Sequence, residues 1–367
     1  MTESQYSSKD RLYAAIGSEE PDRVPVLTYS NHFQIRQAGY SYGEVTEDGD
    51  KFVEAQIAGL EEFGYDGVTG LGGPGMIAEA LGAKLLVGED QSPSMAEPGL
   101  SGGSDDVDLD ELYSRDVIEG DHIPFTLEVN ERLAEELGSG VPMVASISAP
   151  FREACLLGGV ERLFEKVVRD PSFVKDIVDL VTEKVYDYAE LVVEAGADIL
   201  GLTDPFASSS MISRSRYREL IYPSEKRVIG RIHGNTGAKV LFHTCGEWGD
   251  RFDLAVEAGA GIYHVDGVGQ LGLDEIRSRY PDVTIMGRVP TTSLLLNGSP
   301  GQVREGTVAN VAAAGDGGNY VLAGNCSLAP ETPSANVKAM VETAETRGNY
   351  PLNPAMDNME EREVYFG

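Results

Sequence analysis

Three side chains suited to binding a transition metal stand out in the sequence. His243 and Cys245 lie in the run Phe-His-Thr-Cys-Gly, and Cys326 follows much later in Gly-Asn-Cys-Ser. Imidazole and thiolate are preferred ligands of zinc, and a site with three protein ligands keeps one coordination position open for a substrate. A structural zinc site usually has four protein ligands and a Cys-x-x-Cys knuckle, which this sequence lacks. We therefore expect these three residues, called the trio below, to hold zinc for chemistry.

Polar residues at the ends of other apolar runs extend this prediction. Asp204 and Asp266 are candidate catalytic residues, because a carboxylate would supply a displaceable fourth ligand or orient His243. The alternative for each is an ordinary carboxylate that caps a loop. Arg288 is a candidate for binding a sulfonate or carboxylate of the substrate, and a salt bridge with a neighbouring acid is the equal alternative.

Eight short β-rich runs are spaced along the chain, and helix-patterned segments follow most of them. Apolar runs that alternate with helices indicate a parallel sheet covered on both faces, and eight such units predict an α/β fold with a single (β/α)8 TIM barrel. The expected strands are 23–29, 65–70, 142–148, 197–204, 238–245, 261–266, 283–289 and 319–325. Chemistry in such barrels takes place at the carboxyl ends of the strands, where all six residues named above are expected.

The connections between these runs differ in length. Apolar residues in 171–195 mostly step by three and four, which predicts a long helix that Gly196 ends. About 70 residues separate the second and third expected strands, too many for a simple connection, so we expect an insertion with structure of its own. Residues 1–350 are expected to form the barrel, and 351–367 an acidic C-terminal tail.

The composition favours some partners and excludes others. The chain has 60 acidic and 29 basic residues, a net charge of -31, which argues against a nucleic acid or an anionic membrane as partner. We see no run of about 20 apolar residues that would span a bilayer and no signal peptide, so we expect a cytoplasmic protein. So acidic a surface is typical of proteins kept soluble in concentrated salt, and we expect a halophilic source.

The chain of 367 residues has only three cysteines. This number is odd and too small for a disulfide framework. We expect reduced thiols. Cys155 stands in an apolar helical context and is expected in the core, which leaves the other two for the trio.

Several motifs give the chain a wider resemblance. The sequence resembles the uroporphyrinogen decarboxylase superfamily, and within it the zinc-dependent corrinoid methyltransferases of the methylcobamide:coenzyme M type. The motifs that carry the resemblance are Asp-Arg-Val-Pro-Val at 22–26, Phe-Gly-Tyr-Asp-Gly at 63–67, Glu-Ala-Gly-Ala-Asp at 194–198, Asp-Pro-Phe-Ala-Ser at 204–208, His-Thr-Cys-Gly at 243–246, Gly-Arg-Val-Pro at 287–290, Leu-Asn-Gly-Ser-Pro at 296–300 and Cys-Ser-Leu-Ala-Pro-Glu-Thr-Pro at 326–333.

This resemblance implies a function and a set of partners. The zinc pattern of the branch, His-x-Cys and a distant Cys, falls on the trio. By the resemblance, zinc is the cofactor and a corrinoid, either methylcobamide or a corrinoid protein, is the co-substrate. The expected enzyme moves a methyl group between that corrinoid and a zinc-activated thiol or similar acceptor, with a small-molecule methyl donor or acceptor as its other partner. In such enzymes the thiolate attacks the methyl group and cobalt leaves in its reduced form.

The decarboxylase branch of the superfamily is the alternative. Its N-terminal loop carries two arginines for the substrate carboxylates; here Arg36 remains as a candidate substrate-binding residue, whereas Tyr40 stands in place of the second. The run Val-Thr-Gly at 68–70 has no counterpart of the aspartate that holds the pyrrole nitrogens in that branch. Metal-free tetrapyrrole decarboxylation is therefore the less favoured interpretation. A non-catalytic protein that binds zinc or corrinoid is the third.

Overall fold

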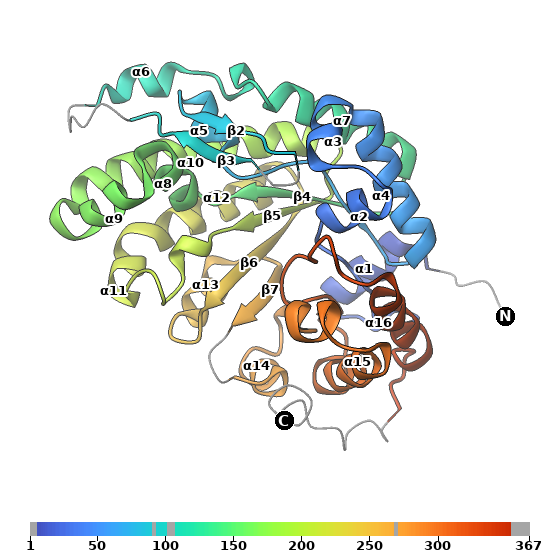
Figure 1. The fold of residues 1–367 in the computed structure, drawn as a ribbon. Helices are drawn as coiled ribbons and strands as arrows, with labels where there is room; N and C mark the ends of the chain where they lie inside the picture. The colour runs from blue at the N-terminus through green and yellow to red at the C-terminus, as the bar shows by residue number, and fades with distance from the viewer. Residues whose placement is uncertain (1–5, 90–92, 101–106, 268–270, 354–367) are drawn as a thin grey trace.

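A curved sheet of seven parallel strands forms most of the barrel wall. The computed structural model describes residues 6–89, 93–100, 107–267 and 271–353. In Figure 1, strands β4 to β7 fan out side by side with their arrowheads toward one side of the molecule. The strands follow the order β1 (Val68–Thr69), β4 (Met143–Ser148), β5 (Ile199–Thr203), β6 (Lys239–Glu247), β7 (Ile262–Gly267), β8 (Thr284–Met286) and β9 (Tyr320–Val321).

The segment 23–29 closes this sheet into the expected (β/α)8 barrel. On one side it contacts β9, because the Leu27 amide donates to the Leu322 carbonyl and the Leu322 amide to the Pro25 carbonyl, both at 2.9 Å. On the other side the Asp66 amide donates to the Val26 carbonyl at 2.7 Å, just before β1. The segment forms isolated bridges and no regular strand, since Pro25 has no N–H to donate. The α/β barrel prediction is confirmed, with this irregular first strand.

A buried carboxylate fixes the closing segment. Asp66 is fully buried, and its oxygens accept from Arg11 at 2.6 Å, from Arg23 at 2.7 Å and from the Val26 amide at 2.8 Å. Charge-assisted hydrogen bonds of this kind are the strong ones. The motifs at 22–26 and 63–67 are thus held together by their Arg and Asp.

Helices cover the outside of the barrel. The predicted helix 171–195 is observed as Pro171–Glu194 and is followed by Gly196 with a φ of 95°. Helices α15 and α16 pack side by side near α1 (Figure 1). The α-helices are α1 (Ser8–Ile16), α2 (His32–Gln37), α3 (Tyr42–Glu47), α4 (Gly49–Phe63), α5 (Met76–Ala80), α6 (Leu109–Ser114), α7 (Ile123–Leu137), α8 (Pro150–Gly158), α9 (Val160–Arg169), α10 (Pro171–Glu194), α11 (Arg214–Arg216), α12 (Tyr222–Asn235), α13 (Phe252–Ala258), α14 (Leu273–Arg279), α15 (Pro300–Ala314) and α16 (Ser334–Arg347). Short 3-10 or π turns are η1 (Val117–Glu119), η2 (Pro205–Ala207), η3 (Tyr217–Ile221) and η4 (Thr291–Leu296). None of the described helices is both long and apolar enough to cross a membrane.

The expected insertion between β1 and β4 has structure of its own. It holds an antiparallel pair, β2 (Lys84–Leu86) and β3 (Ser94–Glu97), together with helices α5 to α7. The predicted acidic tail lies almost wholly in 354–367, which is outside the described residues.

Mostly apolar side chains fill the barrel interior next to the site of the trio. Leu241 of β6 is paired in register with Ile262 of β7, and His243 with His264 one step further along. Because side chains on a strand alternate between faces, Leu241 and His243 point into the barrel together. The interior cluster consists of Leu12, Leu27, Tyr29, Val144, Ile199, Leu241, Ile262, Met286, Val321 and Ala323. His243 therefore lies on β6 next to this apolar layer.

Candidate metal centre

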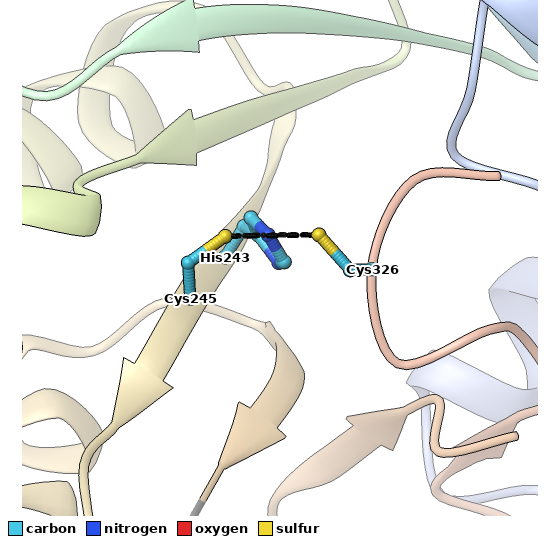
Figure 2. Close-up of side chains that lie close together, drawn as sticks. All are labelled: His243, Cys245 and Cys326. Carbon is cyan, nitrogen blue, oxygen red and sulfur yellow. Dashed lines mark hydrogen bonds between the residues drawn. The ribbon is translucent and has the colours of Figure 1, made fainter. Parts of the chain in front are cut away.

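The three residues of the trio meet at the carboxyl ends of the strands. The Nε2 atom of His243 lies 2.7 Å from Sγ of Cys245 and 3.7 Å from Sγ of Cys326, and the two sulfurs are 3.8 Å apart (Figure 2). The ligand atoms all lie within 4.8 Å of one another. His243 is buried and both cysteines are half-buried. A soft N/S set of this size fits a single zinc ion, with access from the barrel mouth.

The neighbouring strand fixes the orientation of the His243 ring. Its Nδ1 atom is 3.3 Å from the main-chain oxygen of His264. A carbonyl oxygen only accepts, so Nδ1 carries the proton and Nε2 presents its lone pair to the thiols. His264 itself is fully buried, and burial lowers the pKa of its imidazole well below the usual value. Its Nε2 donates to the Gly324 carbonyl at 2.8 Å, two residues before Cys326.

A break in the β6–β7 pairing presents Cys245 at the mouth. The register shifts between Thr244 and Glu247, and Gly246 takes a φ of 74°, which favours glycine. The indole Nε1 of Trp248, which is fully buried, donates to the Cys245 carbonyl at 3.0 Å. The main chain at Cys245 is thus held by a hydrogen bond from a large, buried side chain.

Asp266 connects the two segments that carry the thiols. One oxygen accepts from the Gly246 amide at 3.1 Å, beside Cys245, and the other accepts from the Asn325 side chain at 2.6 Å, beside Cys326. Burial raises the pKa of this carboxyl. Asp266 therefore lies at the site. It binds the residue that follows Cys245 and the residue that precedes Cys326.

The pKa values of the two thiols are shifted in opposite directions. The hydrogen bond from Cys245 lowers the pKa of Cys326, and burial acts in the opposite direction. The pKa of Cys245 is raised, chiefly by the same bond to Cys326 and by burial.

Asp204 directly follows β5. Its Oδ1 accepts from the amides of Phe206 and Ala207 at 3.0 and 3.1 Å, which caps η2. Burial raises its pKa to about 7. Burial, and then the charge of Asp204, likewise raise the pKa of the fully buried Glu225 to about 8, and this carboxyl accepts from the Tyr217 hydroxyl at 2.6 Å. The structure therefore places Asp204 in a buried carboxyl pair with Glu225, a partner that sequence reasoning missed.

The two predicted arginines lie just after β8 and on α2. Arg288 follows β8, and its Nη1 donates to the Leu271 carbonyl at 2.7 Å. Arg36 is exposed on α2, in a shallow pocket with His32, Tyr42 and the Pro330–Glu331 segment. This pocket adjoins the loop that follows Cys326. Neither guanidinium has a hydrogen bond or ion pair with the trio among the described contacts.

Sequence reasoning also missed residues that support the site. Tyr29 packs against His243 with the ring centroids 5.7 Å apart, and its hydroxyl donates to Ser146 at 3.0 Å. Asn325 could have been noticed from its place beside Cys326. The role of Trp248 depends on a contact across a turn, for which the sequence holds no signal. Cys155 is fully buried in α8, as predicted.

The sequence was compared with known families and proteins. The family described as "Uroporphyrinogen decarboxylase (URO-D)" matches residues 7–347, nearly the whole chain. This chain belongs to the uroporphyrinogen decarboxylase family. Among its curated relatives, the "Methylcobamide:CoM methyltransferase MtbA" of Methanosarcina mazei is 26% identical over 345 residues, which are 93% of this chain and 98% of the relative. A "Uroporphyrinogen decarboxylase" of Anaeromyxobacter dehalogenans is 23% identical over 358 residues, 92% of this chain and 99% of that one.

A solved structure shares the architecture of this chain. A "methyltransferase from Methanosarcina mazei" superposes with a TM-score of 0.80 at 24% identity, and the match covers 93% of this chain and 99% of that one. At this identity the likeness establishes the barrel fold of the uroporphyrinogen decarboxylase family and nothing finer.

Proposed function

We propose that this protein is a zinc-dependent methyltransferase that moves a methyl group between a corrinoid and a thiol. The observation that carries the proposal is the convergence of one imidazole and two thiols within 4.8 Å at the mouth of the barrel. The names of the methylcobamide:CoM methyltransferases, which match along 93% of this chain, support it. A decarboxylase of tetrapyrroles needs no such donor set.

The reaction balances without an external oxidant or reductant. A C–S bond forms and a Co–C bond breaks: the sulfur supplies the electron pair of the new bond, the pair of the old bond stays on cobalt, and the thiol proton passes to solvent. Zinc held by His243, Cys245 and Cys326 would keep the acceptor sulfur in its thiolate form near neutral pH, where a free thiol of pKa about 8.5 is mostly protonated.

The other site residues prepare the donor set. The His264 carbonyl holds the proton on Nδ1 of His243, so that Nε2 is free to bind a metal. We propose that Asp266 fixes the distance between the two segments that carry the thiols. Asp204 is proposed to hold the turn at η2. Arg288 and Arg36, on the rim, are proposed to contact the corrinoid or the segment of a corrinoid protein that presents it.

The cellular location is proposed from the same chemistry. Thiols that must stay reduced suit the cytoplasm, and the net charge of -31 suits a salt-rich one. A corrinoid protein is the proposed macromolecular partner.

Zinc analysis combined with a methylcobalamin assay tests the proposal. The purified protein should contain one zinc per chain and should demethylate methylcobalamin when a thiol is supplied. Cys326→Ser should lose both zinc and activity while the fold is retained, whereas Cys155→Ala, at a cysteine remote from the trio, should keep both. A metal-free wild type that decarboxylates uroporphyrinogen, undisturbed by a chelator, would sink the proposal. Full zinc without methyl transfer to any thiol would leave a binding protein.

A further inference from the structure

We propose that a small pocket between α2 and the loop after Cys326 binds a primary carboxamide at the edge of the corrinoid. The inference rests on the proposed function, because it gives a place to one part of the proposed co-substrate. The pocket, called the rim pocket below, has a volume of about 100 Å³. Pockets that hold a whole drug-sized ligand measure about 300–1,000 Å³, so this one suits a single side group. The rim pocket is lined by His32, Ile35, Arg36, Tyr40, Tyr42, Pro330 and Glu331.

The rim pocket lies at the same end of the barrel as the trio. Segment 23–29 pairs in parallel with the chain at β9, so its carboxyl end lies with the carboxyl ends of the other strands. Helix α2 begins at His32, three residues after that end. On the opposite wall, Pro330 follows Cys326 by four residues, a span of at most about 14 Å. A corrin ring is much wider than the trio, so its edge reaches the barrel rim when its methyl group faces the thiols.

Hydrogen bonds join the two walls of the rim pocket at both ends. The hydroxyl of Ser30, just before α2, donates to the Leu328 carbonyl at 3.3 Å. The hydroxyl of Ser334, at the start of α16, donates to the side-chain oxygen of Gln37, the last residue of α2, at 2.6 Å. The rim pocket is therefore formed in advance, as is usual for ligand sites.

A buried tyrosine supplies one polar group of the rim pocket. Tyr42 is 4% exposed, and its ring stacks on the His32 ring with the centroids 4.6 Å apart. Burial raises the pKa of Tyr42 to about 12, so the phenol keeps its proton at neutral pH, and within the described residues its hydroxyl has no hydrogen-bond partner. Burial of a hydroxyl without a partner is costly, and a polar group that enters the rim pocket can supply the partner.

The charges that line the rim pocket favour a neutral ligand group. Arg36 brings a positive charge with N–H donors, and Glu331 brings a negative charge with acceptor oxygens. Burial lowers the pKa of His32, so this ring is neutral near pH 7. A carboxylate would be attracted by Arg36 and repelled by Glu331, and the reverse holds for an ammonium group. A primary amide has no charge and offers both an acceptor oxygen and two N–H donors, so it suits both side chains.

Corrinoids present such a group at their edge. A corrin ring carries several primary amides on short methylene arms around its periphery, whereas the tetrapyrrole substrates of a decarboxylase carry carboxylates there. Ile35 and Pro330 add apolar surface to the rim pocket, which suits the methylene groups of such an arm. Glu331 disfavours the acid. The rim pocket therefore matches the edge of a corrinoid better than that of an acidic tetrapyrrole.

Corrinoids that differ in one side group test the inference. The probes are methylcobalamin and its monocarboxylic acids, in each of which one edge amide is replaced by a carboxylate. In equilibrium dialysis without thiol, the wild type should bind methylcobalamin about three- to tenfold more tightly than the acid whose carboxylate falls in the rim pocket. Glu331→Gln should remove this preference, because the acid then meets Arg36 without an opposing charge. Tyr42→Phe should weaken the binding of methylcobalamin about three- to tenfold, because it removes the hydroxyl and keeps the ring. Tyr113→Phe, at an exposed tyrosine of α6, is the matched control and should bind as the wild type does.

Binding measured apart from methyl transfer separates this inference from the proposed function. Equal binding of methylcobalamin and all of its acids by the wild type would overturn the rim pocket as an amide site. So would binding that is unchanged in both Tyr42→Phe and Glu331→Gln. A wild type that prefers methylcobalamin to one acid, yet transfers its methyl group to no thiol, would overturn the proposed function and uphold the rim pocket. Both variants should keep the zinc content of the wild type and its KM for the thiol, because they leave the trio intact.

Discussion

The side-chain amide of Asn325 donates to the carboxylate of Asp266 at 2.6 Å. Asn325 precedes Cys326, and Asp266 also accepts from the amide that follows Cys245. The oxygen of Asn325 accepts in turn from the Thr291 amide at 2.8 Å. One amide side chain therefore connects the thiol of the last loop to the thiol of β6.

Asn325→Ala should weaken metal retention without unfolding the barrel. Loss of a partner that orients a metal ligand typically costs 10- to 100-fold in affinity, and we expect about tenfold here. Competition with a chromogenic zinc chelator measures this. Asn297→Ala, at an exposed asparagine that bonds only within its own turn, serves as the control and should retain zinc as the wild type does. Equal affinity in Asn325→Ala would show that the loop holds Cys326 without this connection.

Gly201→Ala should disturb the packing beneath the site. A Cβ at this position would overlap the hydroxyl of Tyr29, which packs on His243. Overpacking of this kind costs about 1–3 kcal/mol, measurable by denaturant unfolding. Gly230→Ala in α12 is the matched control, because a Cβ there meets nothing within 4 Å. That variant should gain about 0.5–1 kcal/mol. If both variants gain stability, Tyr29 moves aside freely.

The carboxyl pair of Asp204 and Glu225 should make stability depend on pH. Their pKa values are raised to about 7 and about 8, so the folded chain binds more protons than the unfolded chain from about pH 4 upward. The free energy of unfolding contributed by the pair therefore falls as pH rises from about 4 to 8.

Glu225→Gln isolates this contribution. It removes one titrating group, keeps an acceptor for the Tyr217 hydroxyl, and leaves Asp204 without an anionic neighbour. The stability of the variant relative to the wild type should rise between pH 5 and 8, by at most about 1.4 kcal/mol per pH unit. Parallel stability curves for the two proteins would contradict the assignment.

Salt should stabilise the protein strongly. With a net charge of -31, self-repulsion opposes the folded state in dilute buffer, and the Debye length falls from about 10 Å at 0.1 M to about 3 Å at 1 M. We expect the thermal midpoint to rise steeply with KCl and only slightly with sucrose at equal osmolality. A midpoint that is already maximal in dilute buffer would refute a halophilic origin.

Much of the fold and part of the site could be predicted from local patterns. The eight apolar runs predicted the barrel, and ligand chemistry together with period-two spacing brought His243 and Cys245 to one face. Two short strands of the insertion, β2 and β3, were not foreseen, because they are mostly exposed and lack an apolar alternation.

Contacts between distant segments account for the rest. The hydrogen bond from Arg288 to the Leu271 carbonyl joins segments that no local pattern brings together. Asp204 was expected beside the metal, and its pairing with Glu225 depends on how α12 packs.

The pairing of Val26 with Leu322 has a consequence for how the protein is made. These residues stand near opposite ends of the chain. The segment 23–29 can therefore form its hydrogen bonds with Leu322 only after the last strand of the barrel has been made. Contacts so far apart in sequence make for slow folding, and an open apolar sheet edge invites association with other chains. A nascent chain that stalls before β9 would hold the segment 23–29 by its contacts with Asp66 alone, so the final segment is the one that closes this barrel.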